Sequence, residues 1–121
     1  MSSDEDAGSR EDRDHPIPRL DTIDVEVRTK NGAYIALVVA TPLKDDPVSR
    51  ARLLRKIDLY LAYFRSPEYR SRCGAPSLEH STIYFKIHSA SDAAMLQLID
   101  GYAAQIEANS ISAEIKLWRT N

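Results

Sequence analysis

The sequence predicts an α+β fold, a two-layer sandwich in which a four-stranded mixed sheet carries two helices on one face. Three observations lead to this prediction: an Asn-Gly dipeptide between two strand-like segments, two amphipathic helix patterns, and a strand-like segment after each helix. The predicted order is ββαβαβ. Because right-handed crossovers would connect the parallel strands, both helices are expected on the same side. Strand order 1-2-3-4 is expected first, and 1-2-4-3 is the alternative.

The composition is that of a globular protein with one domain. The chain has 121 residues, of which 43% are hydrophobic and 28% charged, and its formal net charge is −2. No apolar run approaches the roughly 18 residues that a membrane helix needs. We expect no secretory signal, because the N-terminus has no hydrophobic stretch. The single cysteine excludes an internal disulfide and favours a reducing, cytoplasmic setting.

The first 19 residues form a polar, acidic segment. Six acidic residues stand against Arg10 and Arg13 within residues 1–15, and no apolar period is present. Such a composition cannot bury enough apolar surface to order the chain. We therefore expect residues 1–19 to be a disordered tail and residues 20–121 to be a single folded domain.

The first two strands are predicted to form a hairpin. Apolar and polar residues alternate from 23 to 28, which is typical of a half-buried strand. Asn31 and Gly32 follow, and both tolerate the positive φ of a tight turn. The next segment, AYIALVVATPL at 33–43, is apolar on both of its sides. It is therefore expected to be a central strand that is partly covered on its second side.

A helix is predicted from Pro47 to Arg65. Asp46 suits the N-cap and Pro47 the first turn. The core stripe at helical spacing consists of Leu53, Ile57, Tyr60, Leu61 and Phe64. The dipeptide at 66–67, Ser-Pro, ends this helix, and a short second turn is considered around 68–72.

The remaining elements are a strand at 81–88, a helix at about 92–108 and a strand at 111–119. The strand STIYFKIH alternates isoleucine and phenylalanine with polar or aromatic residues. Asp92 is the expected N-cap of the helix, whose apolar side includes Met95, Ile99 and Ile106. In the last strand, Ala, Ile and Leu alternate with Glu, Lys and Trp.

These segments together resemble a family of small bacterial proteins that share a domain of unknown function. The resemblance is carried by IDVEVRTKNGAYIALVV at 23–39, LLRKIDLYLAYFRSPEY at 53–69, IYFKIH at 83–88 and ISAEIKLW at 111–118, about three-quarters of the chain. It implies an opening hairpin, an amphipathic helix and a C-terminal βαβ unit. It implies no activity, cofactor or site residue.

One face of the predicted sheet is the first candidate for function. If the helices cover the side of Ile35, Ile83 and Ile115, the opposite side presents aromatic, apolar and basic side chains. These are Tyr34, Val38, Tyr84, Lys86, His88, Lys116 and Trp118. Such a face fits a protein partner or a second copy of the chain. Stacking of single-stranded nucleic acid is the less favoured interpretation, and cover by the tail or a loop is a third.

The outer side of the first helix is the second candidate. Its basic face consists of Arg52, Arg55, Lys56, Leu59 and Tyr63, which lie away from the core stripe on a helical wheel. This face fits an acidic partner or a phosphate, although a solvated helix surface is the simpler interpretation. We also consider that the acidic tail folds back onto it.

Catalytic signals are weak. The sequence has no Gly-rich phosphate loop and no multi-Cys or multi-His motif, so no metal and no cofactor are expected. Cys73 lies near Arg70 and Arg72, which would favour its thiolate, but an ordinary loop cysteine is the simpler interpretation. The leading hypothesis is a non-enzymatic protein-interaction module, as a homodimer or a complex component. Nucleic-acid binding is the alternative, and an enzyme that uses Cys73 or His88 is the weakest hypothesis.

Overall fold

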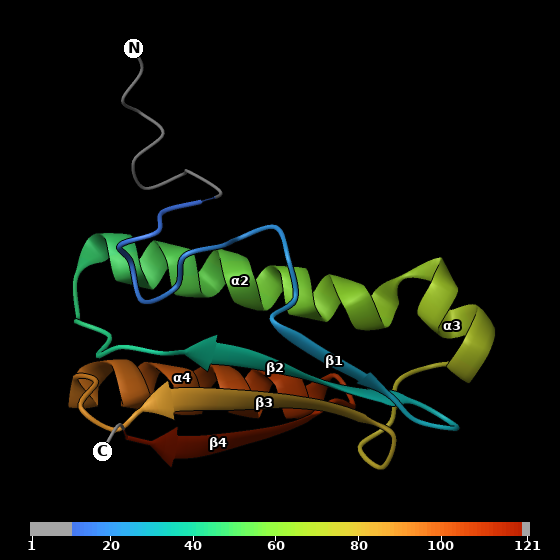
Figure 1. Cartoon of the computed structure of the whole chain (residues 1–121). Helices are drawn as coiled ribbons and strands as arrows, with labels where there is room; N and C mark the ends of the chain where they lie inside the picture. Colours follow the sequence, from blue (N-terminus) through green and yellow to red (C-terminus); the bar gives the residue numbers. More distant parts are fainter. Residues whose placement is uncertain (1–10, 120–121) are drawn as a thin grey trace.

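The computed structural model describes residues 11–119 and has the predicted α+β architecture (Figure 1). One sheet contains β1 (Val25–Arg28), β2 (Ala33–Val39), β3 (Ser81–His88) and β4 (Ser112–Trp118) in the order β1-β2-β3-β4. β1 is antiparallel to β2, whereas β2, β3 and β4 are mutually parallel. The mixed sheet and the first of the two expected strand orders are therefore confirmed.

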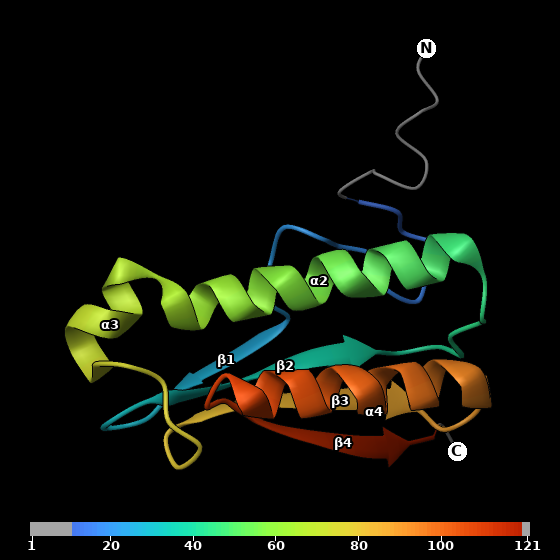
Figure 2. The ribbon, with the colours of Figure 1, turned by 180° about the vertical axis from the view of Figure 1, so that it is seen from behind.

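The helix layer contains α2 (Pro47–Arg65), α3 (Pro67–Cys73) and α4 (Ala93–Ala108). α2 and α4 lie on the same side of the sheet, α2 beside β1 and β2 and α4 beside β3 and β4 (Figures 1 and 2). The short helix α3 is the one element beyond the predicted ββαβαβ order. Ser66 ends α2 and also caps α3, because its hydroxyl accepts a hydrogen bond from Tyr69 N at 3.1 Å.

The hydrophobic core fills the space between the helices and one face of the sheet. Its central residues come from every layer and are Ile35, Leu37, Val39, Leu53, Ile57, Phe64, Ile83, Phe85, Ile87, Met95 and Ile99. Tyr60 is fully buried among them and donates a hydrogen bond to the carbonyl of Ala36 at 2.6 Å. Burial raises the pKa of this phenol, which therefore stays a donor.

The starts of the two long helices are tied to each other. Asp46 caps α2 as predicted, because its carboxylate accepts from Ser49 N at 2.7 Å. Asp92 stands at the predicted N-cap of α4 but makes no side-chain bond to its own helix. Its carboxylate accepts from Asp45 N at 2.7 Å, and the Ser91 hydroxyl accepts from Leu43 N at 2.9 Å. The segment that leaves β2 is therefore held against the start of α4.

The predicted hairpin is present, but its glycine serves a different purpose. Residues 29–32 connect β1 to β2, and neither Asn31 nor Gly32 adopts a positive φ. Gly32 instead lies against the backbone of His80, where a Cβ atom would stand 2.0 Å from the His80 carbonyl oxygen. The next amide, Ala33 N, donates to that oxygen at 2.9 Å. Close approach of two backbones is therefore what requires glycine here.

β1 directs its polar side toward the helices. The pairing register places Glu26 opposite Ile35, and Ile35 faces the core. Side chains that are opposite each other in a sheet share one face, so Glu26 and Arg28 lie on the helix side and Val25 and Val27 on the other. Val25 is accordingly 38% exposed. The valines of β1 thus enlarge the face that the helices leave uncovered.

Part of the expected tail belongs to the folded domain. Residues 11–24, which we name the N-terminal strap, run along α2 before entering β1 (Figure 1). Ile17 and Leu20 of the strap are buried in the core cluster. The prediction that all of 1–19 is a disordered tail is therefore wrong for residues 11–19, and residues 1–10 lie outside the described part.

Substitution of Gly32 tests the close approach of the hairpin to His80. Gly32→Ala places a Cβ atom against a carbonyl that also accepts the Ala33 hydrogen bond. We expect a loss of about 1–3 kcal/mol in the free energy of unfolding, measured with urea.

Gly101→Ala is the matched control for Gly32→Ala. No atom lies within 4 Å of the added Cβ, and Gly101 is inside α4. This control should gain about 0.5–1 kcal/mol from helix propensity. Equal stability of the two variants would contradict the account of the hairpin.

Candidate functional site

The sheet face that the helices leave uncovered is the main candidate site. We name it the open sheet face. The register assigns to it Val25, Val27, Tyr34, Ala36, Val38, Thr82, Tyr84, Lys86, His88, Ser112, Glu114, Lys116 and Trp118. All seven residues predicted from the sequence lie on this face. Four strands contribute to it, so the face is broad and rigid.

Aromatic pairs give the open sheet face its shape. The rings of Tyr34 and Tyr84 meet edge to face with centroids 5.5 Å apart. At the other end of the face, His88 and Trp118 pair in the same way at 5.2 Å. The first pair joins β2 to β3, and the second pair joins β3 to β4. These contacts fix the ring orientations before any partner arrives.

Shallow hollows lie between the aromatic pairs. One of about 400 Å³ is lined by Val38, Lys86, Lys116 and Trp118. A neighbouring one of about 320 Å³ shares the two lysines and is also lined by Val25, Tyr34, Ala36 and Tyr84. Apolar and aromatic side chains therefore line both hollows together with the same two lysines.

The two lysines are directly opposite each other. Lys86 of β3 pairs with Lys116 of β4 in the register. Opposed like charges destabilise a sheet. The Lys116 ammonium is 3.9 Å from the Glu114 carboxylate and 5.2 Å from the centre of the Tyr84 ring, and both contacts reduce the repulsion. A carboxylate from a partner would reduce it further.

Val25 and Val27 add β1 to the open sheet face, a strand that contributed none of the residues predicted from the sequence. Their alternation with acidic residues is that of any half-buried strand, which ordinarily turns its valines inward. The signal that could have identified them lies in α2. Lys56 and Tyr63 are polar residues directed at β1, so they require polar partners on the side of β1 that faces them.

The predicted basic helix face is not a free surface. Arg52 and Lys56 are buried beneath the N-terminal strap, with 0% and 1% of their surface exposed. Leu59 and Tyr63 are partly buried, and Arg55 alone of the five predicted residues is exposed. Helical spacing correctly grouped these residues but could not reveal that the strap covers them. The expectation that this face is open to an acidic partner or a phosphate is wrong.

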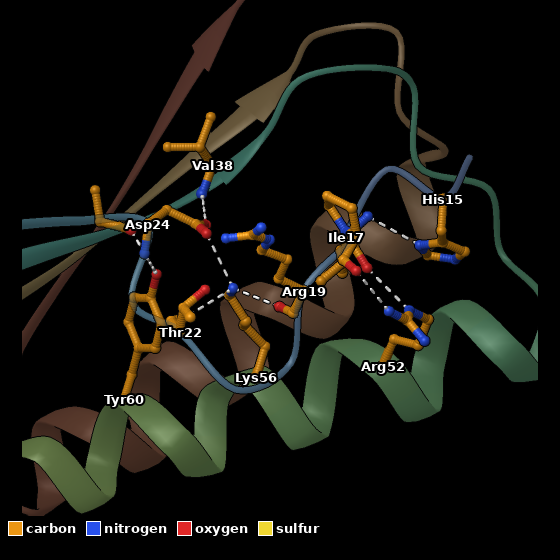
Figure 3. A network of polar contacts seen from close by, with 11 residues as sticks. His15, Ile17, Arg19, Thr22, Asp24, Val38, Arg52, Lys56 and Tyr60 are labelled. Carbon is orange, nitrogen blue, oxygen red and sulfur yellow. Dashed lines mark hydrogen bonds and ion pairs between the residues drawn. The ribbon is translucent and has the colours of Figure 1, made fainter. Parts of the chain in front are cut away.

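Arg52 and Lys56 hold the strap through its backbone carbonyls (Figure 3). Arg52 donates from Nε to Ile17 O at 2.8 Å and from a terminal nitrogen to Pro18 O at 3.2 Å. Burial lowers the pKa of this guanidinium. The hypothesis that the acidic tail folds onto the basic face concerns residues 1–15, of which 1–10 lie outside the described part. Arg52 binds the strap through the carbonyl oxygens of residues 17 and 18.

Lys56 is the centre of this network (Figure 3). Its ammonium donates to Arg19 O, to Thr22 O at 2.8 Å and to the Asp24 carboxylate at 2.9 Å. Three donors and three acceptors satisfy the buried charge completely. The other oxygen of Asp24 accepts from Val38 N at 2.9 Å, so the same carboxylate joins α2 to the free edge of β2 beyond β1.

His15 fastens the first part of the strap. Its Nδ1 accepts from Ile17 N at 2.9 Å, and its Nε2 lies 3.0 Å from the Ser49 hydroxyl. Since Nδ1 accepts, the ring is neutral with its proton on Nε2. Burial, followed by the nearby Arg52 charge, lowers the pKa of His15 below its ordinary value. Both effects favour the neutral ring that this geometry requires.

Glu26 and Tyr63 connect the end of α2 to β1. The Tyr63 hydroxyl donates to Glu26 at 2.7 Å, and Arg28 donates to the same oxygen at 3.0 Å. These bonds lower the pKa of Glu26, while burial and the carboxylate raise the pKa of Tyr63 to about 12. A groove of about 380 Å³ lies here, beside Glu68 and Arg72. Its main polar groups already bond to one another.

The two residues of the enzyme hypothesis lie far apart. Cys73 ends α3, whose Tyr69 bonds to Ser81 at the start of β3. His88 is at the other end of the same strand, about 23 Å from Ser81 at ~3.3 Å per residue. The His88 Nδ1 accepts from Ala90 N at 3.0 Å, which orients the ring but places no nucleophile beside it. The structure therefore does not bring Cys73 and His88 together.

Residues 11–119 contain no group of three or more His, Cys, Asp or Glu side chains that could hold a metal ion. No helix in this part of the chain is long and apolar enough to cross a membrane. Comparisons with protein-family models, with curated proteins and with solved structures found no match.

Replacement of Lys56 tests the role of the buried ammonium. Lys56→Met keeps most of the side-chain volume but leaves the Asp24 carboxylate and two strap carbonyls without their shared donor. We expect a loss of about 3 kcal/mol in the free energy of unfolding, measured by urea denaturation.

Arg55→Met is the matched control on the same helix. Arg55 is exposed, so its replacement should change stability by at most about 0.5 kcal/mol. If Lys56→Met were as stable as Arg55→Met, the network would not hold the strap.

Proposed function

We propose that this chain is a non-enzymatic protein-interaction module and that the open sheet face is its binding surface. The observation that carries the proposal is the composition of this face: apolar or aromatic side chains come from all four strands, although helices cover the other side of the sheet. An uncovered sheet face of this composition is characteristic of a surface that a partner covers.

The detailed chemistry of the face supports a protein as its partner. Tyrosine and tryptophan are enriched in the centres of protein interfaces, where they bury a large area at a small entropic cost. Tyr34 and Tyr84 are held by mutual contact, so little of their freedom would be lost on binding. The opposed Lys86 and Lys116 favour a partner that contributes a carboxylate between them.

Cover by the chain's own tail receives no support from the described residues. The strap lies along α2, through its bonds to Arg52 and Lys56, and not on the open sheet face. The partner that we propose is a second copy of the chain or another protein. The experiment that follows detects either one.

Replacement of Tyr34 tests the proposal. Tyr34 is 38% exposed, and Tyr34→Glu adds a charge to the apolar part of the open sheet face. A partner that wild type retains in affinity purification from the source cells should be lost by this variant, at a cost of ten-fold or more in affinity. A second copy would be identified as that partner only by a self-association in sedimentation that Tyr34→Glu abolishes.

Leu54→Glu is the matched control for Tyr34→Glu. Leu54 is exposed to a similar extent, 42%, but lies on α2. It makes the same exchange of an apolar residue for an acid outside the face, and we expect it to retain the partner. If all three forms recovered the same proteins in equal amounts, the open sheet face would not be the binding surface.

Binding of single-stranded nucleic acid is the second candidate function. It is favoured by one observation, the Lys116 ammonium over the Tyr84 ring beside Lys86. Two lysines would neutralise two phosphates, so the logarithm of affinity should fall with the logarithm of salt concentration with a slope of about −1.4. A titration with single-stranded oligonucleotide at two salt concentrations tests this, and no binding at low salt would eliminate the candidate.

A further inference from the structure

The outer edge of β4 is an unprotected strand edge. β4 is last in the sheet order, and within residues 11–119 no segment pairs with its side away from β3 (Figures 1 and 2). Seven successive residues, Ser112–Trp118, pair with β3 without a bulge. Their outward N–H and C=O groups form a straight row that can accept another strand.

The opposite edge of the sheet is protected. β1 has only four residues, and the Asp24 carboxylate bonds to Val38 N where β2 extends beyond β1. Short strands, side-chain cover, proline and charged side chains are the usual defences of an edge. Of these, β4 has only the charges of Glu114 and Lys116, which have opposite signs. Its Leu117, on the helix side, is 55% exposed.

The residues of β4 complement themselves when the strand is reversed. If two copies pair antiparallel about Ile115, Glu114 of one copy lies opposite Lys116 of the other, on the open-face side. On the helix side, the small Ala113 lies opposite the exposed Leu117. The ends bring Ser112 opposite Trp118. Charge and size are thus matched at every position of SAEIKLW.

No other antiparallel register of this strand offers the same match. Opposed residues must lie on the same face of the sheet. The two-fold axis is perpendicular to the sheet, so it must pass between one residue and the same residue of the second copy. Centring on Glu114 or on Lys116 opposes like charges. Centring on Ala113 or Leu117 separates Glu114 from Lys116 and shortens the overlap. The register about Ile115 also pairs the whole strand.

We propose that two copies of this chain associate through antiparallel pairing of β4 about Ile115. The main-chain hydrogen bonds supply affinity, and the two Glu114–Lys116 pairs select the register. Two four-stranded sheets then become one continuous sheet, with the helices of both copies on one side. The two open sheet faces come to lie side by side. The pairing does not depend on what those faces bind.

A charge exchange tests this pairing. Glu114 and Lys116 are both 55% exposed, so the variants should fold like wild type. Wild type should sediment as a dimer with a measurable Kd. Glu114→Lys and Lys116→Glu should each raise that Kd about ten-fold or more, because two attractive pairs become two repulsive ones. The double variant Glu114→Lys/Lys116→Glu should restore the wild-type Kd, and a mixture of the two single variants should form a heterodimer.

Two further variants separate this pairing from contact through the open sheet face. Leu117→Glu changes only the helix side of β4 and should weaken the dimer, whereas Tyr34→Glu changes only the open sheet face and should leave it intact. A monomer at all concentrations up to about 1 mM would overturn the proposal. A dimer that survives Leu117→Glu but is lost with Tyr34→Glu would also overturn it while supporting the proposed function. Partner loss with Tyr34→Glu alone tests the proposed function separately.

Discussion

The buried ammonium of Lys56 is the constraint on which the arrangement of the first third of the chain depends. Lys56 is 1% exposed, and a buried ammonium is stable only when each of its protons has an acceptor. All three acceptors come from the strap. The ammonium therefore determines where the strap runs and on which side Asp24 lies. Asp24 thereby anchors the start of β1, in which Glu26 lies on the helix side and Val25 on the other side.

This orientation of β1 explains the candidate site. With Glu26 directed to Tyr63 and Asp24 to Lys56, the valines of β1 can only face away from the helices. They extend the apolar surface of Tyr34 and Tyr84 to the edge of the sheet. A polar network on one side of the sheet thereby produces an apolar surface on the other. The same network occupies the edge of β2 beyond the short β1, whereas β4 at the other end of the sheet has no neighbour on its outer side within residues 11–119.

Local signals predicted most of the fold, and long-range contacts account for what they missed. The Asp46 cap, the core stripe of α2 and the alternation of β3 each depend on neighbours in the sequence, and each is confirmed. The burial of Lys56 depends on a segment more than thirty residues away, which no helical wheel represents. Composition likewise suggested that residues 1–19 are disordered. What anchors residues 11–19 is one buried isoleucine and a set of backbone carbonyl groups, and composition registers neither. The open sheet face was predicted where its residues lie on β2, β3 and β4, and missed on β1.

The orientation of β1 can be observed directly by NMR of the folded chain with labelled methyl groups. If the account is right, the methyl groups of Val25 and Val27 show nuclear Overhauser effects to the ring protons of Tyr34 and to Tyr84, and none to the methyl groups of Leu53 and Ile57. Overhauser effects from Val25 and Val27 to Leu53 or Ile57 would place the valines in the core. That result would contradict both the role of Lys56 and the extent of the open sheet face.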